Sequence, residues 1–221
     1  KGKIVDIKPS RVRKELEKGK IVVVAGFQGA DEKGDPVTLG RGGSDTSAVA
    51  LAGALKADAC EIYTDVDGVY SADPRLVPDA RKMKEITYDE MLEMARLGAG
   101  VMQPRSVEMG MYFNIPIHVR STFTNKPGTM IREAYKMEEK DFLIRGVAHD
   151  SNVAKVAVLG VPNDPGVAHA IFSALSEKNI AVDMIVQSIR NIEKNVTDMV
   201  FTITQDDLAE AKKIVDGVAE K

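Results

Sequence analysis

The sequence of 221 residues predicts an α/β protein in two parts. Up to about residue 145, short apolar runs alternate with amphipathic helical segments, which is typical of a layered α/β fold. The remainder reads strand, helix, strand, strand, helix within about 70 residues, the ferredoxin-like βαββαβ order without its last strand. An apolar content of 44% is sufficient to bury a core in each part.

The first part opens with a continuous apolar run at residues 21–25, which predicts a strand covered on both faces. Residues 46–55 follow as a helix rich in small side chains, and residues 60–64 as a second strand. The expected buried face of that helix comprises Ala48, Leu51, Ala52 and Leu55.

Thr87 and Glu90 form a capping-box pattern, which predicts that a helix begins here and continues to Leu97, before Gly98. A further helix is expected at residues 106–112. Strands are expected at residues 115–121 and 129–132.

A polar segment at residues 135–141 is expected to be a linker, which gives domains at 1–140 and 141–221. In the second domain, strands are expected at 153–161, 181–189 and 197–204, and helices at 167–178 and 206–218.

The most informative stretch is the run Thr-Leu-Gly-Arg-Gly-Gly-Ser-Asp at residues 38–45. Its glycines let backbone N–H groups approach an anion closely. Ser44 and Asp45 are both favoured N-cap residues, so the following helix should begin there and direct its free amides at the same anion. Arg41 adds a planar donor group suited to a carboxylate or a phosphate. A tight glycine turn with an exposed arginine would have the same sequence.

A second polar run, at residues 63–75, follows the strand predicted at residues 60–64. Open α/β sheets bind ligands at the carboxyl ends of their strands. Thr64 and Asp65 offer a hydroxyl and a carboxylate there, Tyr70 a flat aromatic face, and Arg75 a cation behind a proline. These groups suit a nucleotide, although an acidic turn with an exposed arginine remains the alternative.

Composition narrows the classes of protein. With 30 basic and 33 acidic residues and no cluster of basic residues, the sequence does not suggest a nucleic-acid-binding surface. Its apolar runs are too short to cross a bilayer. The single cysteine, Cys60, is expected to be buried in a reducing compartment. His118, His149 and His169 lack metal-ligand spacing, so no metal site is expected. We expect a cytoplasmic protein.

The residues at 39–45, at 63–75 and at 97–101 together resemble the aspartate kinase (aspartokinase) family of the amino-acid kinase fold. The second part resembles the first of that family's two ACT regulatory domains, through Asp-Pro-Gly at 164–166 and residues 182–187. The resemblance is collinear over essentially the whole chain. It implies a part of the three-layer α/β kinase domain, its C-terminal nucleotide-binding part, followed by a ferredoxin-like ACT domain.

The resemblance implies ATP-dependent phosphorylation of the side-chain carboxylate of L-aspartate, with Mg²⁺, as the first step toward lysine, threonine and methionine. Arg41 would hold the substrate carboxylate, helped by Gly42, Gly43 and Ser44, and Asp45 would orient a catalytic lysine or the metal. The implied nucleotide contacts are Thr64, Asp65, Tyr70, Ser71, Ala72, Asp73, Pro74, Arg75, Gly100 and Val101.

For the second domain, the start of the helix near Val167 offers amides to an amino-acid carboxylate, and Asp183 or Asn163 could pair with its ammonium group. The resemblance implies feedback by lysine or threonine where ACT domains meet, and a homo-oligomer or a second type of subunit. The implied effector contacts are Asn163, Gly166, Val167, Ala168, Ala181, Val182, Asp183 and Gln187.

Two features depart from the family pattern. The family's N-terminal Lys-x-Gly-Gly-Thr-Ser signature is absent, so we expect a fragment that does not turn over alone. Gly100 stands where many relatives carry a lysine that reaches the nucleotide. Two other functions stay open: another amino-acid kinase, such as one for glutamate, and a non-catalytic amino-acid sensor.

Overall fold

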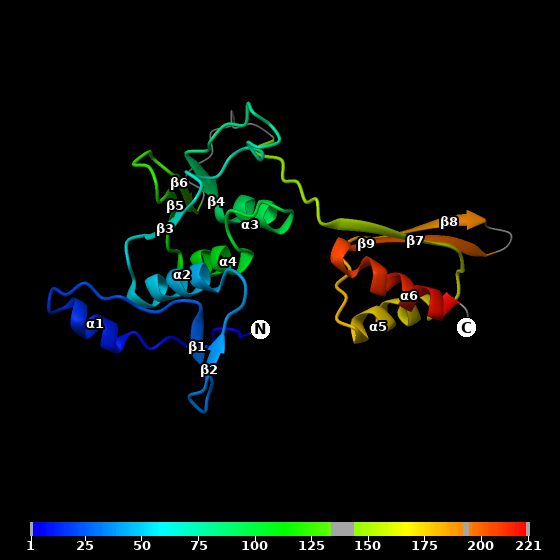
Figure 1. Cartoon of the computed structure of the whole chain (residues 1–221), viewed down its shortest axis with the longest axis horizontal. Helices are drawn as coiled ribbons and strands as arrows, with labels where there is room; N and C mark the ends of the chain where they lie inside the picture. Colours follow the sequence, from blue (N-terminus) through cyan, green and yellow to red (C-terminus); the bar gives the residue numbers. More distant parts are fainter. Residues whose placement is uncertain (1, 134–143, 192–194, 220–221) are drawn as a thin grey trace. The chain divides into compact units, whose positions relative to one another are not determined.

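The computed structural model describes residues 2–133, 144–191 and 195–219, which form two compact units, Lys1–His149 and Asp150–Lys221 (Figure 1). The expected linker at 135–141 and the expected domain boundary at residue 140 lie outside the described residues. Each unit has its own hydrophobic core.

The first unit is built on a four-stranded sheet in the order β3-β5-β6-β4. Its strands are β3 (Cys60–Thr64), β4 (Glu85–Thr87), β5 (Ile117–Ser121) and β6 (Thr129–Arg132). The central pair β5–β6 is antiparallel, whereas β3–β5 and β4–β6 are parallel. The strands predicted at residues 60–64 and 129–132 are confirmed, and the one predicted at 115–121 begins two residues later.

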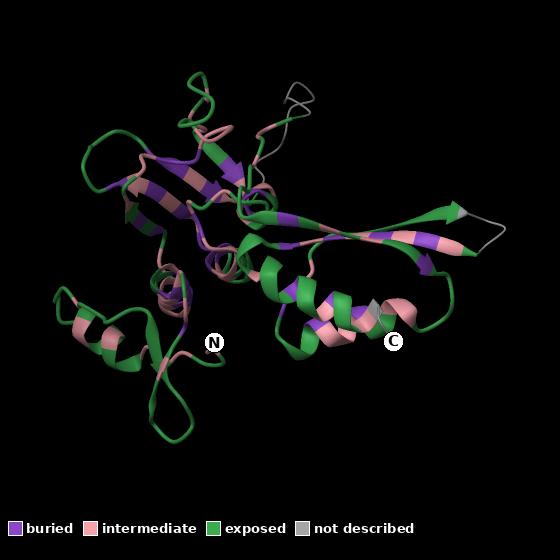
Figure 2. Ribbon diagram, turned by 45° about the vertical axis from the view of Figure 1, so that its right-hand side comes forward, coloured by how far each residue is buried: buried purple, intermediate pink, exposed green. Residues whose placement is uncertain are grey.

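Three helices, α2 (Gly43–Leu55), α3 (Tyr88–Arg96) and α4 (Pro104–Phe113), lie along one side of this sheet (Figure 1). The capping box is confirmed, because the Thr87 hydroxyl accepts from the Glu90 N–H at 3.2 Å and the Glu90 carboxylate accepts from the Thr87 N–H at 2.9 Å. Buried residues lie on both the strands and the helices of this unit (Figure 2). They include Val107 of α4 and Ile117 and Val119 of β5, all fully buried.

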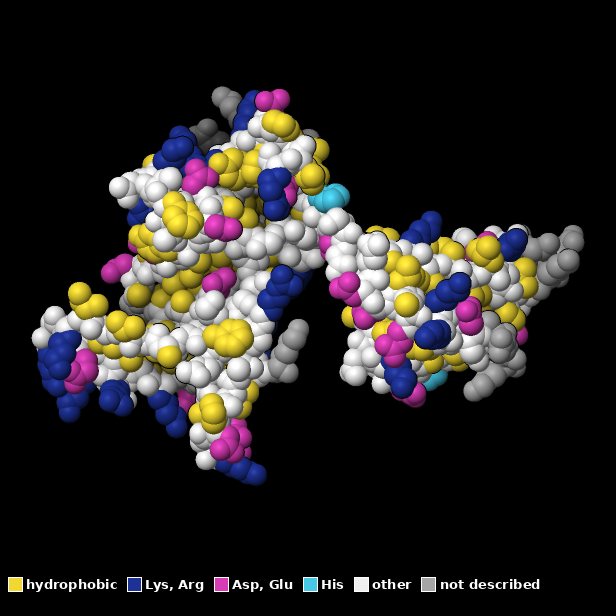
Figure 3. Space-filling view, viewed as in Figure 1, with side chains coloured by type: hydrophobic (Ala, Val, Ile, Leu, Met, Phe, Trp, Pro, Cys, Tyr) yellow, Lys and Arg dark blue, Asp and Glu magenta, His cyan; other side chains and the backbone are white. Residues whose placement is uncertain are grey.

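The strand predicted at residues 21–25 is wrong. Ile21 and Val23 are 96% and 92% exposed, and no described strand pairs with this segment. A strand needs a hydrogen-bonding neighbour and a cover for its apolar side chains, and neither is present among the described residues. The nearby strands are instead a short hairpin of β1 (Gln28–Ala30) and β2 (Pro36–Thr38), after an unpredicted helix α1 (Ser10–Leu16). Figure 3 shows other hydrophobic side chains on the surface of this unit.

Helix α2 begins three residues before the predicted start, and its predicted buried face is wrong except for Ala52, which is partly buried against the core. Ala48 is exposed, and the buried positions are Thr46, Val49, Ala50, Gly53 and Gly43. The reason is the packing of α2 on α4: a Cβ added at Gly53 would lie 2.4 Å from the ring of Phe113. Small residues let these two helices approach closely, so small size rather than hydrophobicity selects the inner face.

The second unit is a three-stranded antiparallel sheet in the order β7-β9-β8, with α5 and α6 on one face. Its elements are β7 (Val153–Pro162), α5 (Val167–Glu177), β8 (Ile185–Asn191), β9 (Val196–Thr204), a short 3₁₀ helix (Gln205–Asp207) and α6 (Leu208–Ala219). Phe201, Leu175 and Ala211 lie at the centre of its core. The predicted βαββα order is confirmed, with β8 beginning four residues later than expected.

Among the described residues, no helix combines the length and the apolar character needed to cross a membrane.

Candidate functional site

The glycine-rich loop at residues 38–45 adopts a conformation that requires glycine. Gly40 and Gly42 have positive φ angles of 81° and 69°, which L side chains rarely adopt. A Cβ added at Gly42 would lie 1.7 Å from Cγ of Gln103, and one at Gly43 would lie 2.8 Å from Cβ of Leu39. The loop backbone therefore lies directly against the start of α4, where no side chain would fit.

Helix α2 begins directly from this loop, with Gly42 as its N-cap. The expectation that Ser44 or Asp45 would cap the helix is wrong, because the left-handed turn at Gly42 starts the helix earlier and places both residues in its first turn. The Ser44 hydroxyl donates to the Asp45 carboxylate at 3.3 Å, and partial burial raises the pKa of Asp45 against the effect of that bond. The Gly43 N–H donates to the Gly40 carbonyl at 2.9 Å, and the remaining N–H groups at this helix start can serve an anion held at the loop.

Arg41 is exposed, and within the described residues its guanidinium has neither a hydrogen-bond nor an ion-pair partner. A guanidinium without a protein partner keeps all five of its donors for a ligand. Ser44 and Ser47 line a hollow of about 1100 Å³ beside the start of α2. Ala48 and Leu51, expected to be buried, line the same hollow.

Arg105, in the first turn of α4, holds the glycine-rich loop from behind. Its guanidinium donates to the carbonyl of Leu39 at 2.9 Å and to the carbonyl of Gly2 at 2.8 Å. Sequence analysis missed this residue, because a single arginine 66 residues from the loop gives no local pattern.

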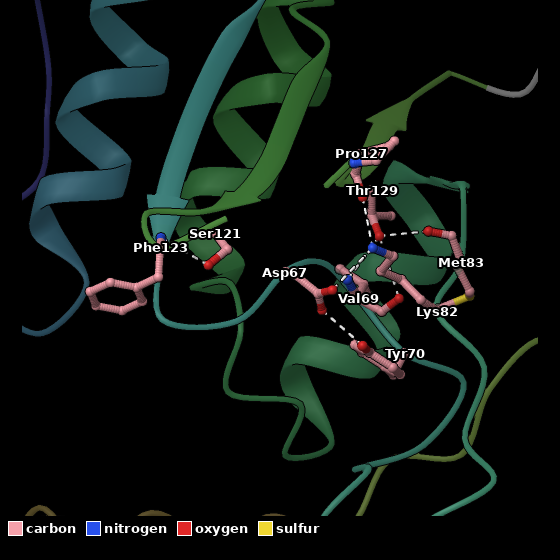
Figure 4. Close-up of polar contacts among 9 residues, drawn as sticks. All are labelled: Asp67, Val69, Tyr70, Lys82, Met83, Ser121, Phe123, Pro127 and Thr129. Carbon is pink, nitrogen blue, oxygen red and sulfur yellow. Dashed lines mark hydrogen bonds and ion pairs between the residues drawn. The ribbon is translucent and has the colours of Figure 1, made fainter. Parts of the chain in front are cut away.

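The second predicted loop begins at the carboxyl end of β3. The Thr64 hydroxyl donates to the Asp65 carboxylate at 3.1 Å. Asp67 accepts from the Tyr70 hydroxyl at 2.8 Å and from the ammonium group of Lys82 at 3.1 Å (Figure 4). The Tyr70 hydrogen bond, with Lys82 contributing, lowers the pKa of Asp67, and the same bond raises the pKa of Tyr70.

Further along this loop, Arg75 forms a bidentate ion pair with Asp73, the shorter contact being 2.7 Å. Arg75 lowers the pKa of Asp73 to about 2. The Arg75 side chain is 87% exposed, so it can reach a ligand phosphate while it stays close to its partner. Ser71 is held by backbone hydrogen bonds, from its N–H to the Arg81 carbonyl and from the Val147 N–H to its own carbonyl.

The loop between α3 and α4 carries the remaining predicted nucleotide contacts. Gly100 is exposed and has open space around its α-carbon, and Val101 packs against the core of the first unit. Cys60 is buried in the same core, as expected, and burial raises the pKa of its thiol to about 11. The described residues contain no group of three His, Cys, Asp or Glu side chains that could hold a metal ion.

In the second unit, the structure brings some of the predicted effector residues together. The Gln187 amide donates to the Asn163 side chain at 3.3 Å, and Gly166, with a φ of 100°, is the N-cap of α5, where Val167 and Ala168 begin the helix. Asp183 is separate from this group. Its N–H bonds the carbonyl of Thr202, whereas Gln187 bonds Thr197, about 16 Å away along β9. Ala181 and Val182 come directly before Asp183 in the sequence and so lie away from Gln187 and Asn163 as well.

Comparison with known proteins defines the class. The amino acid kinase family model matches residues 1–121, more than half of the chain, and an ACT domain model matches residues 156–217. The chain therefore belongs to the amino acid kinase family.

The resemblance to aspartokinases is also confirmed. The chain is 50% identical over 206 residues to a protein named aspartokinase from Mycolicibacterium smegmatis, covering 92% of this chain and 49% of the relative. It is 48% identical to an aspartate kinase from Pseudomonas putida, covering 100% of this chain and 53% of the relative. The chain thus spans about half the length of the curated relatives it matches.

Solved structures agree. Escherichia coli aspartokinase III in complex with aspartate and ADP matches with a TM-score of 0.71 and 31% identity, over 89% of this chain and 42% of that chain. Clostridium acetobutylicum aspartate kinase matches with a TM-score of 0.76 and 27% identity, over 89% of this chain and 45% of that one. These matches cover both units of the chain and support the assignment of an amino-acid kinase domain followed by an ACT domain.

Proposed function

We propose that this chain supplies the nucleotide-binding part and a substrate-binding loop of an aspartate kinase, together with a regulatory ACT domain. The enzyme would transfer the γ-phosphoryl group of ATP to the side-chain carboxylate of L-aspartate, giving 4-phospho-L-aspartate. This reaction is the first step toward lysine, threonine and methionine. A resemblance to aspartokinases at about half identity, over nearly all of the chain, supports the proposal.

The observation that carries the proposal is Arg41, exposed and without a described partner, on a glycine-rich loop at the start of α2. A planar guanidinium binds a carboxylate through two parallel hydrogen bonds. Gly42, Gly43 and Ser44 would add N–H and hydroxyl donors to the same ligand. Asp45 would orient the catalytic cation or the metal.

The loop at residues 64–75 would hold ATP, with Tyr70 beside the base and Arg75 beside the phosphates. Gly100 and Val101 would add backbone contacts. Phosphoryl transfer depends on in-line positioning and on neutralising the charge that develops on the phosphate oxygens. Bound Mg²⁺ would supply part of that neutralisation, and the residues of this chain would position the nucleotide and the acceptor.

Regulation would come from the ACT domain, with lysine or threonine bound near Asn163, Gly166 and Gln187. The hydrogen bond between Gln187 and Asn163 supports one part of this site. Asp183, Ala181 and Val182 would belong to it only through a second copy or another subunit, which fits the pairing of ACT domains into oligomers. The enzyme would be cytoplasmic.

Calorimetric titration of the chain with Mg·ADP and, separately, with L-aspartate tests the proposal. Arg41→Ala should weaken aspartate binding about tenfold or more and leave Mg·ADP binding unchanged. The substitution removes the charged hydrogen-bond donor that is proposed to bind aspartate, and no donor that is proposed to bind the nucleotide. Arg11→Ala, on the exposed face of α1, is the matched control. Loss of ADP affinity with unchanged aspartate affinity would reverse the assignment.

The same titrations separate the alternatives. Preference for L-glutamate over L-aspartate would favour another amino-acid kinase. Binding of lysine or threonine without any nucleotide binding would favour a non-catalytic sensor.

A further inference from the structure

One cation joins three separate segments behind the proposed nucleotide loop. Lys82, three residues before β4, donates to the Asp67 carboxylate at 3.1 Å and to the Pro127 carbonyl at 2.7 Å (Figure 4). Asp67 lies within the loop, and Pro127 lies in the turn that leads into β6. Lys82 therefore connects the loop to the turn at Pro127, which lies 45 residues after Lys82 in the sequence.

This ion pair is partly shielded from water. The side chains of Lys82 and Asp67 are 25% and 24% exposed, about half the values of 54% and 50% for Arg96 and Glu108 in the same unit. Shielding reduces screening by salt, so the pair holds its geometry better than an exposed pair does. The carboxylate has a second partner, because the Tyr70 hydroxyl donates to its other oxygen at 2.8 Å.

The base of the loop is fixed from the same side. The hydroxyl of Thr129, on β6, accepts from the Val69 N–H at 2.8 Å and donates to the Met83 carbonyl at 2.6 Å. Gly68 fits between, since an added Cβ would lie 2.6 Å from the Thr129 hydroxyl and 3.0 Å from Cδ of Lys82. Gly68 and Val69 are buried at this point of the loop, whereas Asp65 before them and Pro74 and Arg75 after them are exposed.

We propose that Lys82 is a positioning residue for the nucleotide. Its ammonium group binds the Asp67 carboxylate, and that carboxylate accepts a hydrogen bond from the Tyr70 hydroxyl. These two linked contacts order the Tyr70 ring and the residues up to Arg75 before the ligand binds. A site ordered in advance binds more tightly because less entropy is lost on binding. The inference rests on the proposed function, since it assigns Lys82 to the same nucleotide site.

Titration of the whole chain with Mg·ADP tests the inference. Lys82→Met keeps an unbranched side chain one atom shorter than lysine and removes its charge, and should weaken Mg·ADP binding about tenfold. Lys82→Arg keeps a donor cation and should restore most of the affinity. Lys84→Met is the matched control, because Lys84 is exposed and its side chain makes no hydrogen bond or ion pair among the described residues. Binding of L-aspartate should be the same in all four proteins.

Hydrogen exchange adds a second readout. Amides of residues 70–75 should exchange faster in Lys82→Met than in wild type or Lys84→Met. If Lys82→Met fails to fold, Asp67→Asn replaces it: this variant keeps an acceptor for Tyr70, removes the ion pair and should lower the affinity similarly.

The outcomes are distinct. Equal Mg·ADP affinity in wild type and in both Lys82→Met and Asp67→Asn would overturn the inference and leave the proposed function standing. Equal losses in Lys82→Met and Lys82→Arg would also overturn it, because the cation would then not be the cause. Absence of Mg·ADP binding by the wild-type chain would overturn the nucleotide site and the inference with it.

Discussion

Thr129 offers a direct test of how buried polar contacts stabilise the first unit. The residue is fully buried, and its hydroxyl pairs with the Val69 N–H and the Met83 carbonyl. Valine replaces that hydroxyl with a methyl group in nearly the same shape, so Thr129→Val removes the two hydrogen bonds and little packing. A buried backbone group left without a partner costs about 1–3 kcal/mol. Because Met83 is only half-buried and can partly rehydrate, we expect a total loss of about 2–4 kcal/mol.

Such a loss is large against a total stability of about 5–15 kcal/mol for a typical domain. Urea unfolding followed by near-UV circular dichroism measures this loss of stability in the first structural unit, because all five tyrosines lie before residue 149 and the chain contains no tryptophan. Thr124→Val, on an exposed turn, is the control and should leave the midpoint unchanged. An equal midpoint for Thr129→Val and wild type would contradict this prediction, because the two hydrogen bonds would then make no net contribution to stability.

Three other predictions test the loop, a helix cap and the buried thiol. Gly42→Ala should weaken L-aspartate binding more than Mg·ADP binding, because φ at 69° strains alanine by about 1 kcal/mol and its Cβ displaces Gln103; calorimetry would contradict this if both affinities stayed at wild-type values. Thr87→Ala should lower the unfolding free energy by about 1 kcal/mol while Thr87→Ser does not, and equal urea midpoints for the two variants would exclude the cap as the cause. Burial raises the Cys60 pKa from 9.0 to about 11, so as the pH rises the thiol ionises in the unfolded chain before it ionises in the folded one. The free energy of unfolding that this thiol contributes is therefore fully present below pH 9 and falls by about 2–3 kcal/mol by pH 11. Cys60→Ala should lack that part of the alkaline loss in urea titrations, and identical pH profiles would count against the burial argument.

Features carried by neighbouring residues could be predicted from the sequence. The capping box at Thr87 depends on a residue three positions away, and the strand at residues 60–64 on its own apolar side chains. The βαββα order of the second unit and the glycine-rich loop at residues 38–45 were likewise predictable. In each case the interacting groups are close along the chain, so the pattern of residue types contains the information.

Features that depend on distant partners were decided by the tertiary structure. The run at residues 21–25 has the composition of a buried strand, yet it lies exposed because no described strand is beside it. The inner face of α2 was selected by Phe113 of α4, which no periodicity within α2 could reveal.

The site itself divides in the same way. From the sequence alone, Arg41 could be predicted to bind a carboxylate and the loop at 64–75 a nucleotide, because their side chains carry the required chemistry. The contacts that hold these residues, from Arg105 behind one loop and from Lys82 behind the other, are visible only in the folded chain. Their partners include Gly2, 103 residues from Arg105, and Pro127, 45 residues from Lys82. In the sequence, a lysine or arginine that is solvated looks the same as one that binds other groups of the protein. The two cases differ only in whether distant backbone carbonyls and carboxylates lie close to the side chain in the folded protein.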